Sequence, residues 1–263
     1  MLMDQTCGDF RTNKTLKQAG FRFGDRGTQT SRTIMLSELT ELLRAVPAEA
    51  ERADYASAII EDNVLGKQTV ANRRHTNQNL GELYGLDHKY PVFHVLRRLW
   101  DMDEEGHPLL AILCALTRDP LLRLAAASVL KLPQGAELVR AIFLAEMLHS
   151  TGARLNPSIL DKVARNAGSS WTQSGHLEGR VRKIRRKVQP TFGPAAFALW
   201  LGSLEGLAGE QLLNCRWAGI LDRSGTEMIE LVLQAKQKGL LHALVGGGVV
   251  EINTTRMDSF QRR

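Results

Sequence analysis

Residues 107–133 read HPLLAILCALTRDPLLRLAAASVLKLP, and this stretch decides the fold class. Its leucine, alanine and isoleucine residues recur at the spacing of a helix face. The pair Asp119-Pro120 must end one helix and begin the next, because the residue before proline avoids the helical region and proline suits a first helical turn. The stretch therefore predicts two helices with a short connection, both packed in an apolar core.

The same pattern extends outward on both sides of this stretch. Residues 91–100 (PVFHVLRRLW) and 135–152 (GAELVRAIFLAEMLHSTG) add two more helix-like segments bounded by proline or glycine, and four consecutive helices make a bundle. Further upstream, helices are expected from Ser31 to Pro47, over residues 49–62, and from Thr69, whose side chain can cap the helix. We therefore predict a helical bundle domain over residues 31–150, preceded by an extended or disordered arm over residues 1–30.

Composition bounds the class of protein. The chain has 263 residues, a length that suggests two domains, and its 43% hydrophobic and 24% charged residues are typical of a soluble globular protein. Its longest apolar runs are far below the roughly 20 residues that span a bilayer, and its first residues do not resemble a signal peptide. Three widely spaced cysteines favour a reducing compartment. We expect a cytoplasmic protein without a membrane anchor.

The pattern changes after Gly152. A short helix is expected over residues 156–168 (NPSILDKVARNAG), and a longer basic one over residues 169–188 (SSWTQSGHLEGRVRKIRRKV), which is the outline of a helix-turn-helix. A third helix (FGPAAFALWLGSLEG, 192–206) would support both. A helix over residues 226–239 and a hairpin around Gly246-Gly247-Gly248 resemble the end of a winged helix. We therefore predict a mainly α chain with a helix-turn-helix or winged-helix-like domain, including a short β-hairpin, over residues 151–263.

Net charge points to an anionic partner. The chain carries +6, but residues 153–188 hold nine basic and two acidic residues, 9 − 2 = +7, which leaves 6 − 7 = −1 for the rest. A local excess of this kind is typical of a surface that binds nucleic acid. Aromatic residues are only 6%, which weakens a model of stacking on single-stranded bases.

The candidate nucleic-acid contacts follow from this excess. On the predicted basic helix, cations would line the surface opposite an apolar stripe of Val181, Ile184 and Val188. The alternative is a solvated helix end, where the helix dipole favours cations. Hydroxyl and amide groups before the cations would contact phosphates or bases, or would only cap the helix. The predicted contacts are Arg180, Arg182, Lys183, Arg185, Arg186 and Lys187, with Ser170, Thr172 and Gln173, and a second weaker cluster of Lys67, Arg73 and Arg74.

No catalytic or cofactor motif accompanies these cations. Gly66-Lys67 lacks the upstream glycine and the following Ser or Thr of a phosphate-binding loop, and the triple glycine lacks the spacing of a dinucleotide site. The seven histidines form no zinc-binding pattern. The acids at Asp101, Asp103, Glu104 and Glu105 favour a solvated loop over a magnesium-dependent nuclease site. We expect no cofactor, no metal and no enzymatic activity.

Several stretches together resemble the BrxA family, a small component of the BREX bacteriophage-exclusion systems. They are IIEDNVLGKQTVANRR (59–74), LRRLW (96–100), LTRDPLLR (116–123), SSWTQSGHLEGRVRK (169–183), GLL (239–241) and VVEI (249–252). None is a catalytic signature. The resemblance implies a mainly helical DNA-binding protein whose N-terminal part is similar to an antitermination-factor fold. The family has also been labelled an inner-membrane protein, which the absence of any membrane-length apolar run in this sequence contradicts.

The sequence thus predicts non-enzymatic binding of double-stranded DNA, in which phosphate contacts give affinity and little sequence choice. Two alternatives stay open. The chain could be an adaptor that docks onto other proteins of a defence complex, with its cations facing an acidic partner. It could also bind RNA, as the antitermination resemblance suggests.

Overall fold

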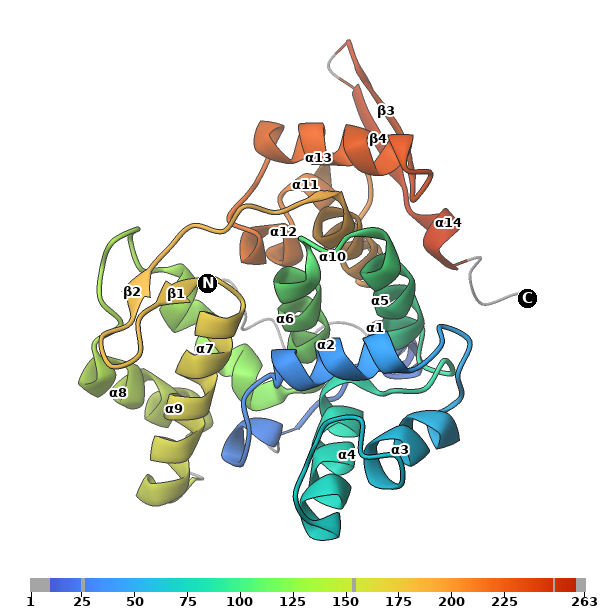
Figure 1. The fold of residues 1–263 in the computed structure, drawn as a ribbon. Helices are drawn as coiled ribbons and strands as arrows, with labels where there is room; N and C mark the ends of the chain where they lie inside the picture. The colour runs from blue at the N-terminus through green and yellow to red at the C-terminus, as the bar shows by residue number, and fades with distance from the viewer. Residues whose placement is uncertain (1–9, 25–26, 153–154, 248, 259–263) are drawn as a thin grey trace.

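The computed structural model describes residues 10–24, 27–152, 155–247 and 249–258. The chain is mainly helical, and its described part adds two small antiparallel sheets of two strands each (Figure 1). In chain order the elements are α1 (Phe10–Ala19), the 3-10 turn η1 (Thr28–Thr30), α2 (Leu36–Ala45), α3 (Arg52–Ile60), α4 (Val70–Tyr84), α5 (Pro91–Met102), α6 (His107–Arg118), α7 (Pro120–Leu130), α8 (Arg140–Thr151), α9 (Pro157–Gln173), β1 (Leu177–Glu178), β2 (Ile184–Arg185), α10 (Phe192–Leu204), α11 (Glu210–Leu213), α12 (Arg216–Ile220), α13 (Thr226–Gln237), β3 (His242–Gly246), β4 (Val249–Asn253) and α14 (Thr255–Asp258).

Two helices form the centre of the molecule. Every residue of α6 from Leu109 to Arg118 is buried, and α10 is buried from Gly193 to Gly202. Helix α10 packs against α5 and α6 on one side and against α12 and α13 on the other. The buried side chains form one continuous apolar core. The predicted mainly α class is confirmed, and the division into two domains stays a prediction.

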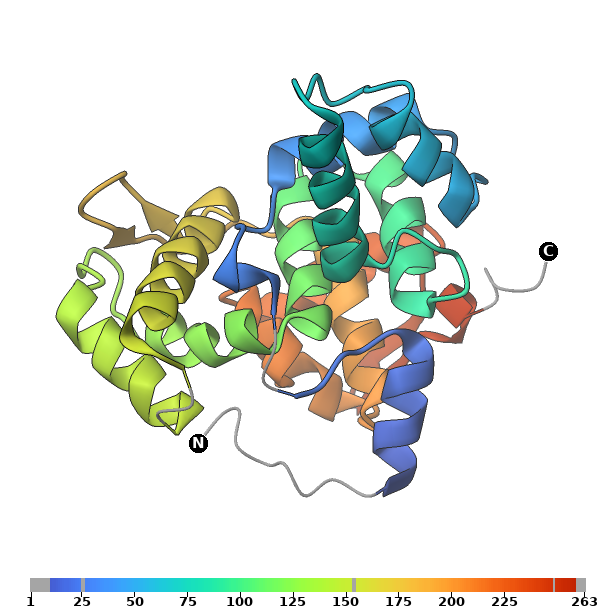
Figure 2. The same ribbon diagram turned by 90° about the horizontal axis from the view of Figure 1, so that it is seen from below.

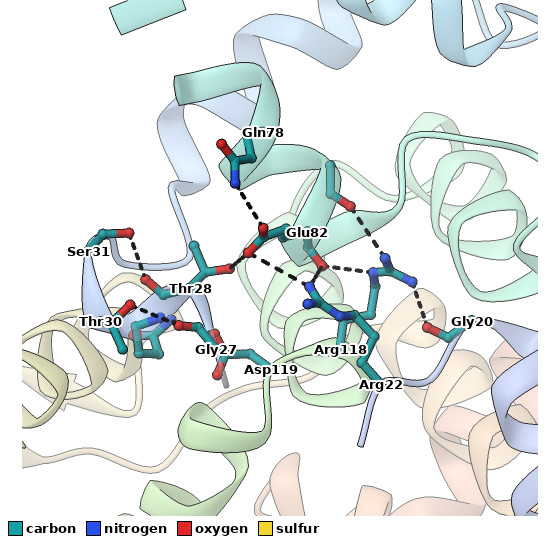
Figure 3. A network of polar contacts seen from close by, with 12 residues as sticks. Gly20, Arg22, Gly27, Thr28, Thr30, Ser31, Gln78, Glu82, Arg118 and Asp119 are labelled. Atoms are coloured by element: carbon teal, nitrogen blue, oxygen red, sulfur yellow. Dashed lines mark hydrogen bonds and ion pairs between the residues drawn. The ribbon is translucent and has the colours of Figure 1, made fainter. Parts of the chain in front are cut away.

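The Arg118-Asp119 pair, at the junction of α6 and α7, holds the N-terminal segment onto this centre (Figure 3). One Asp119 oxygen caps α7 by accepting from the Leu122 N–H at 3.0 Å, and the other accepts from the Gln29 N–H at 3.1 Å. The Arg118 guanidinium donates to the carbonyls of Gly20 at 2.6 Å and Glu82 at 2.9 Å. Burial raises the pKa of Asp119, and the backbone N–H donors act against that rise.

The predicted N-terminal arm is corrected for its described part. Residues 10–19 form helix α1, and Leu16, Ala19 and Phe21 are buried. The Phe21 ring meets the Trp217 ring edge-on, with 5.9 Å between centroids. Too few apolar residues lie in this segment to show a helical period, and its partners lie about 100 to 200 residues away in sequence. Residues 1–9, the rest of that arm, lie outside the described residues.

The predicted basic helix over residues 169–188 is also wrong. Helix α9 runs without a break from Pro157 to Gln173, and the chain then forms the β1–β2 hairpin. Gly179 makes the turn, because at φ +103° a side chain is strained and its Cβ would lie 2.1 Å from the Arg182 carbonyl oxygen. Gly168 lies inside α9 and does not end it, and the stem of Lys183 packs where its side chain would be.

The end of the chain follows the prediction. Helix α13 is followed by β3 and β4, which pair antiparallel with Val245 opposite Val250. Ala243 and Ile252 are buried on the inner face of this hairpin.

The close contact between Gly27 and Asp119 allows a test of the Arg118-Asp119 junction. A Cβ at Gly27 would lie 2.1 Å from Asp119 Oδ1, and that carboxylate is held by two backbone N–H groups. We expect Gly27→Ala to lower the free energy of unfolding by about 1–3 kcal/mol in urea titrations, as overpacking does. Gly246→Ala, where a Cβ would meet nothing within 4 Å, is the control and should change stability little. Equal stabilities of the two variants would contradict the role of this junction.

Candidate nucleic-acid interface

The basic segment is a hairpin held on both edges of its second strand. Strand β2 pairs with β1, in the register of Leu177 opposite Arg185. On the other edge of β2, the backbone N–H of Arg185 donates to the Ala136 carbonyl at 2.8 Å, and the backbone N–H of Leu138 donates to the Lys183 carbonyl at 2.8 Å. The connection between α7 and α8 thus supplies a third, short paired segment. The backbone that carries the cations is therefore fixed by pairing, and the hairpin lies at one edge of the molecule, beside α8 and α9 (Figure 1).

Four of the predicted cations are exposed on this hairpin: Arg180, Arg182, Arg186 and Lys187. Arg182 forms an ion pair with Glu137 at 2.8 Å, and Arg186 forms one with Glu178 at 2.5 Å. Ion pairs on the surface contribute at most about 1 kcal/mol, so a phosphate can compete for these guanidinium groups. No side chain of the described residues pairs with Arg180 or Lys187.

The prediction that Arg185 contacts nucleic acid is corrected, because this residue lies inside the protein with 2% of its surface exposed. Its guanidinium forms an ion pair with Asp222 and donates to the Val129 carbonyl at 3.1 Å. The second Asp222 oxygen accepts from the Val188 N–H at 3.0 Å. Arg185 therefore anchors the hairpin to the α7 and α12 ends and cannot contact DNA in this fold. Since alternate residues of a strand point to opposite faces, Arg185 and Arg186 do not share the surface that a helix would give them.

The predicted polar contacts before the cations are largely structural as well. The Ser170 hydroxyl is buried and accepts from the Ile34 N–H at 3.0 Å, while Gln173 Oε1 accepts from the Leu36 N–H at 3.1 Å. Both side chains thus tie the start of α2 to α9. Thr172 Oγ1 accepts from Lys183 Nζ at 2.9 Å, which turns that lysine back toward α9. Partial burial lowers the pKa of Lys183.

The second predicted cluster does not extend the hairpin surface. Lys67 forms an ion pair with Glu38 at 3.0 Å, and Arg73 donates to the Ile60 carbonyl at 3.0 Å, so both stabilise the turn between α3 and α4. Arg74 is exposed. Figures 1 and 2 both place α4 apart from β1 and β2. A DNA footprint that includes both clusters has no support in the arrangement of the helices.

Sequence reasoning missed two of the three acids that face the basic segment, Glu137 and Asp222. Six cations lie between Arg180 and Lys187, and Glu137, Glu178 and Asp222 pair with three of them, which leaves 6 − 3 = +3. Glu137 and Asp222 lie 45 and 37 residues from their partners, so no local pattern reveals them. The hairpin is still cationic, and its free charge is concentrated on the exposed face.

His176 lies directly beneath the hairpin and is fully buried. Its Nε2 lies 2.6 Å from the Ile220 carbonyl, which requires a proton on Nε2, and its Nδ1 lies 2.8 Å from the Ser174 hydroxyl. Burial lowers the pKa of His176 to about 4, against partial opposition from the Ile220 carbonyl and the Asp222 carboxylate. His176 is therefore neutral at physiological pH and serves as part of the support under β1.

Removal of Arg185 tests its structural role. We expect Arg185→Gln to lower the free energy of unfolding by about 3–5 kcal/mol, because the nearly buried Asp222 carboxylate loses its cation. Arg186→Gln, one residue along on the exposed face, should cost less than about 1 kcal/mol. Urea denaturation measures both. A stable Arg185→Gln protein that fails to bind nucleic acid would instead support the sequence-based role of this arginine.

His176 gives a pH dependence with a defined sign. In the unfolded chain a histidine titrates near 6.5, whereas the folded His176 stays neutral down to about pH 4, so the unfolded state binds more protons between these values. The contribution of His176 should therefore reduce stability by about 3 kcal/mol as the pH falls from 6.5 to 4. His176→Gln should show a correspondingly shallower loss in urea titrations over this range. Parallel pH curves for the two proteins would contradict this assignment.

The described residues form neither a metal site nor a membrane-spanning helix. Across residues 10–24, 27–152, 155–247 and 249–258, no three His, Cys, Asp or Glu side chains gather into a candidate metal site. The same ranges contain no helix with the length and apolarity needed to cross a membrane. Comparison of the chain with protein-family models and with curated proteins finds no match.

Proposed function

We propose that the chain binds double-stranded DNA without enzymatic activity, through the exposed cations of the β1–β2 hairpin. One observation carries this proposal: Arg180, Arg182, Arg186 and Lys187 are all exposed on a hairpin whose backbone is paired on both sides of β2. A fixed backbone loses little conformational entropy when the cations contact a partner. The interface needs no cofactor and no metal.

The chemistry of these side chains favours phosphate as the ligand. Arginine presents a planar set of donors that matches phosphate oxygens, and each neutralised phosphate releases condensed counterions. Such contacts give affinity and set the position of the protein on a duplex, but they read little sequence. The expected partner is therefore a duplex of mixed sequence. Arg185, Ser170 and Gln173 support the hairpin and the α2–α9 contact and leave the DNA contacts to the four exposed cations.

The biological setting in this proposal rests on the resemblance to the BrxA family. Under it, the chain is a cytoplasmic DNA-binding component of a bacterial phage-defence system of the BREX type and acts beside other defence proteins. The structure contributes the mainly helical fold that the resemblance implies.

A second candidate, the adaptor that docks onto other defence proteins, is favoured by α8. This helix and the residue before it expose three apolar side chains, Val139, Ile142 and Leu148, with Ile142 at 59%. Exposed apolar side chains on one helix offer contacts to a partner protein. A partner held this way would stay bound after nuclease treatment and at high salt, whereas a complex bridged by DNA would not.

The proposal is tested by fluorescence anisotropy with labelled duplex DNA, single-stranded DNA and duplex RNA between about 50 and 200 mM salt. The test variant combines Arg180→Gln, Arg182→Gln, Arg186→Gln and Lys187→Gln. We expect wild-type protein to prefer duplex DNA with a log-log salt slope of several units. The variant should lose about 3 to 4 units of that slope if all four cations contact phosphates, because each contributes about 0.9.

The matched control removes the same charge elsewhere by combining Lys14→Gln, Lys17→Gln, Arg44→Gln and Lys236→Gln, all at exposed positions. It should keep most of the affinity and the slope. Equal losses in both variants would show that net charge, and not the hairpin, drives binding. Absence of binding by wild type to any nucleic acid would sink the proposal and leave the adaptor function, and a preference for duplex RNA would favour the RNA-binding alternative.

A further inference from the structure

The tip of the β1–β2 hairpin presents an apolar side chain to solvent. Val181 is 91% exposed, more than any other large apolar residue that the structure describes. It stands between two exposed arginines, Arg180 and Arg182. This valine adds no buried apolar area to the stability of the fold, because it is not part of the core. The tip therefore has the form of a cation, an apolar side chain and a second cation in consecutive positions.

The fold holds Val181 in this exposed position. Gly179 turns the chain at φ +103°, and Lys183 Nζ reaches back to the Gly179 carbonyl at 3.4 Å. On the opposite side of the loop, the Arg182 carbonyl oxygen lies 2.1 Å from where a Cβ at Gly179 would be. With both ends of the loop fixed in this way, the tip cannot fold Val181 back onto the protein without breaking these contacts.

The surroundings of the hairpin limit what it can enter. A free two-stranded ribbon can lie in the major groove, but here β2 is covered on its outer edge by residues 135–138 and Arg185 points into the protein. Only the loop between the strands stands clear of the helices, as the gold loop at the left of Figure 2 shows. The part of the hairpin that can penetrate a groove is therefore the tip.

The width of the tip limits which of its atoms can enter each groove. Two steps of chain place the Cα atoms of Arg180 and Arg182 at most about 7 Å apart. The minor groove of B-DNA is about 6 Å wide and the major groove about 12 Å. The backbone of the tip is therefore too wide to enter the minor groove, but its arginine side chains can extend along that groove while the valine side chain between them faces the base edges.

We propose that the side chains of the hairpin tip enter the minor groove of duplex DNA, with Val181 as an apolar wedge against a base step and Arg180 and Arg182 along the groove. This inference rests on the proposed function. Proteins that bind the minor groove combine arginines with apolar wedges that partly unstack a step and bend the duplex. Narrow A·T-rich grooves attract arginine, and TA steps unstack easily. The tip therefore favours A·T-rich duplexes that contain a TA step.

The test uses a duplex with an A·T-rich centre and 2-aminopurine beside a TA step, with dyes at the two ends that report bending by energy transfer. We expect wild-type protein to raise the 2-aminopurine fluorescence, to bend the duplex and to be displaced by netropsin, which occupies A·T-rich minor grooves. Val181→Ser should abolish both signals and weaken binding about tenfold, because burial of a valine side chain is worth one tenfold step or more. Its salt slope should not change, since the cations remain.

Two control variants separate the wedge from general effects. Val181→Leu keeps an apolar tip and should keep both signals. Val249→Ser removes a valine that is 64% exposed on the other hairpin and should behave as wild type. Thermal melts of all variants should agree, because neither valine is in the core.

The outcomes distinguish this inference from the function on which it rests. Salt-dependent binding of duplex DNA that is insensitive to Val181→Ser and to netropsin would overturn the wedge and leave the proposed function standing. Failure of wild-type protein to bind any duplex would overturn both.

Discussion

The fold depends on one charged pair buried at a helix junction. Asp119 accepts hydrogen bonds from the backbone N–H groups of Leu122 and Gln29. Arg118 donates hydrogen bonds to the backbone carbonyls of Gly20, Gly81 and Glu82. These backbone groups lie in the N-terminal segment, α4 and α7. Buried backbone groups without partners are costly, so this pair lets three segments meet around α6 without leaving polar atoms unsatisfied.

A chain of polar contacts continues from this junction to the basic hairpin. The Asp119 carboxylate holds the Gln29 backbone, and the Gln29 side chain accepts from the Ser170 hydroxyl at 2.9 Å. Asn166, also on α9, donates to the Gln29 carbonyl at 2.7 Å. Helix α9 leads directly into β1. The position of the candidate DNA-binding hairpin is thus set by contacts that begin at the core of the α-helical bundle.

The sequence predicts those parts of the structure that local patterns determine. Asp119-Pro120, the Thr69 cap and the proline at the start of α5 mark helix boundaries that the structure confirms. The prediction of a basic helix was wrong. The helical spacing of Val181, Ile184 and Val188 indicates a helix, whereas two glycines before them indicate a turn. Gly175 and Gly179 both have positive φ, which ends a helix and builds a turn.

The candidate site was predictable in composition but not in geometry. The local excess of cations marks the segment that carries the candidate site. Which cations are exposed depends on distant residues, since Asp222 draws Arg185 inside and Glu137 holds Arg182 at the surface. Likewise, Ser170 and Gln173 resemble capping or phosphate-binding residues until the Ile34 and Leu36 N–H groups are seen to occupy them. Contacts over such separations leave no trace in a single sequence.

The partners of Arg118 also bear on how the protein is made. Gly20 precedes Arg118 by 98 residues, so a ribosome that adds about 5–20 residues per second needs roughly 5–20 s after Gly20 to synthesise its donor. The Ile34 N–H stays without its acceptor for longer, because Ser170 is synthesised 136 residues later. During synthesis the first helices therefore emerge without the groups that fix them, and the N-terminal segment can complete these contacts only after Ser170 has been made.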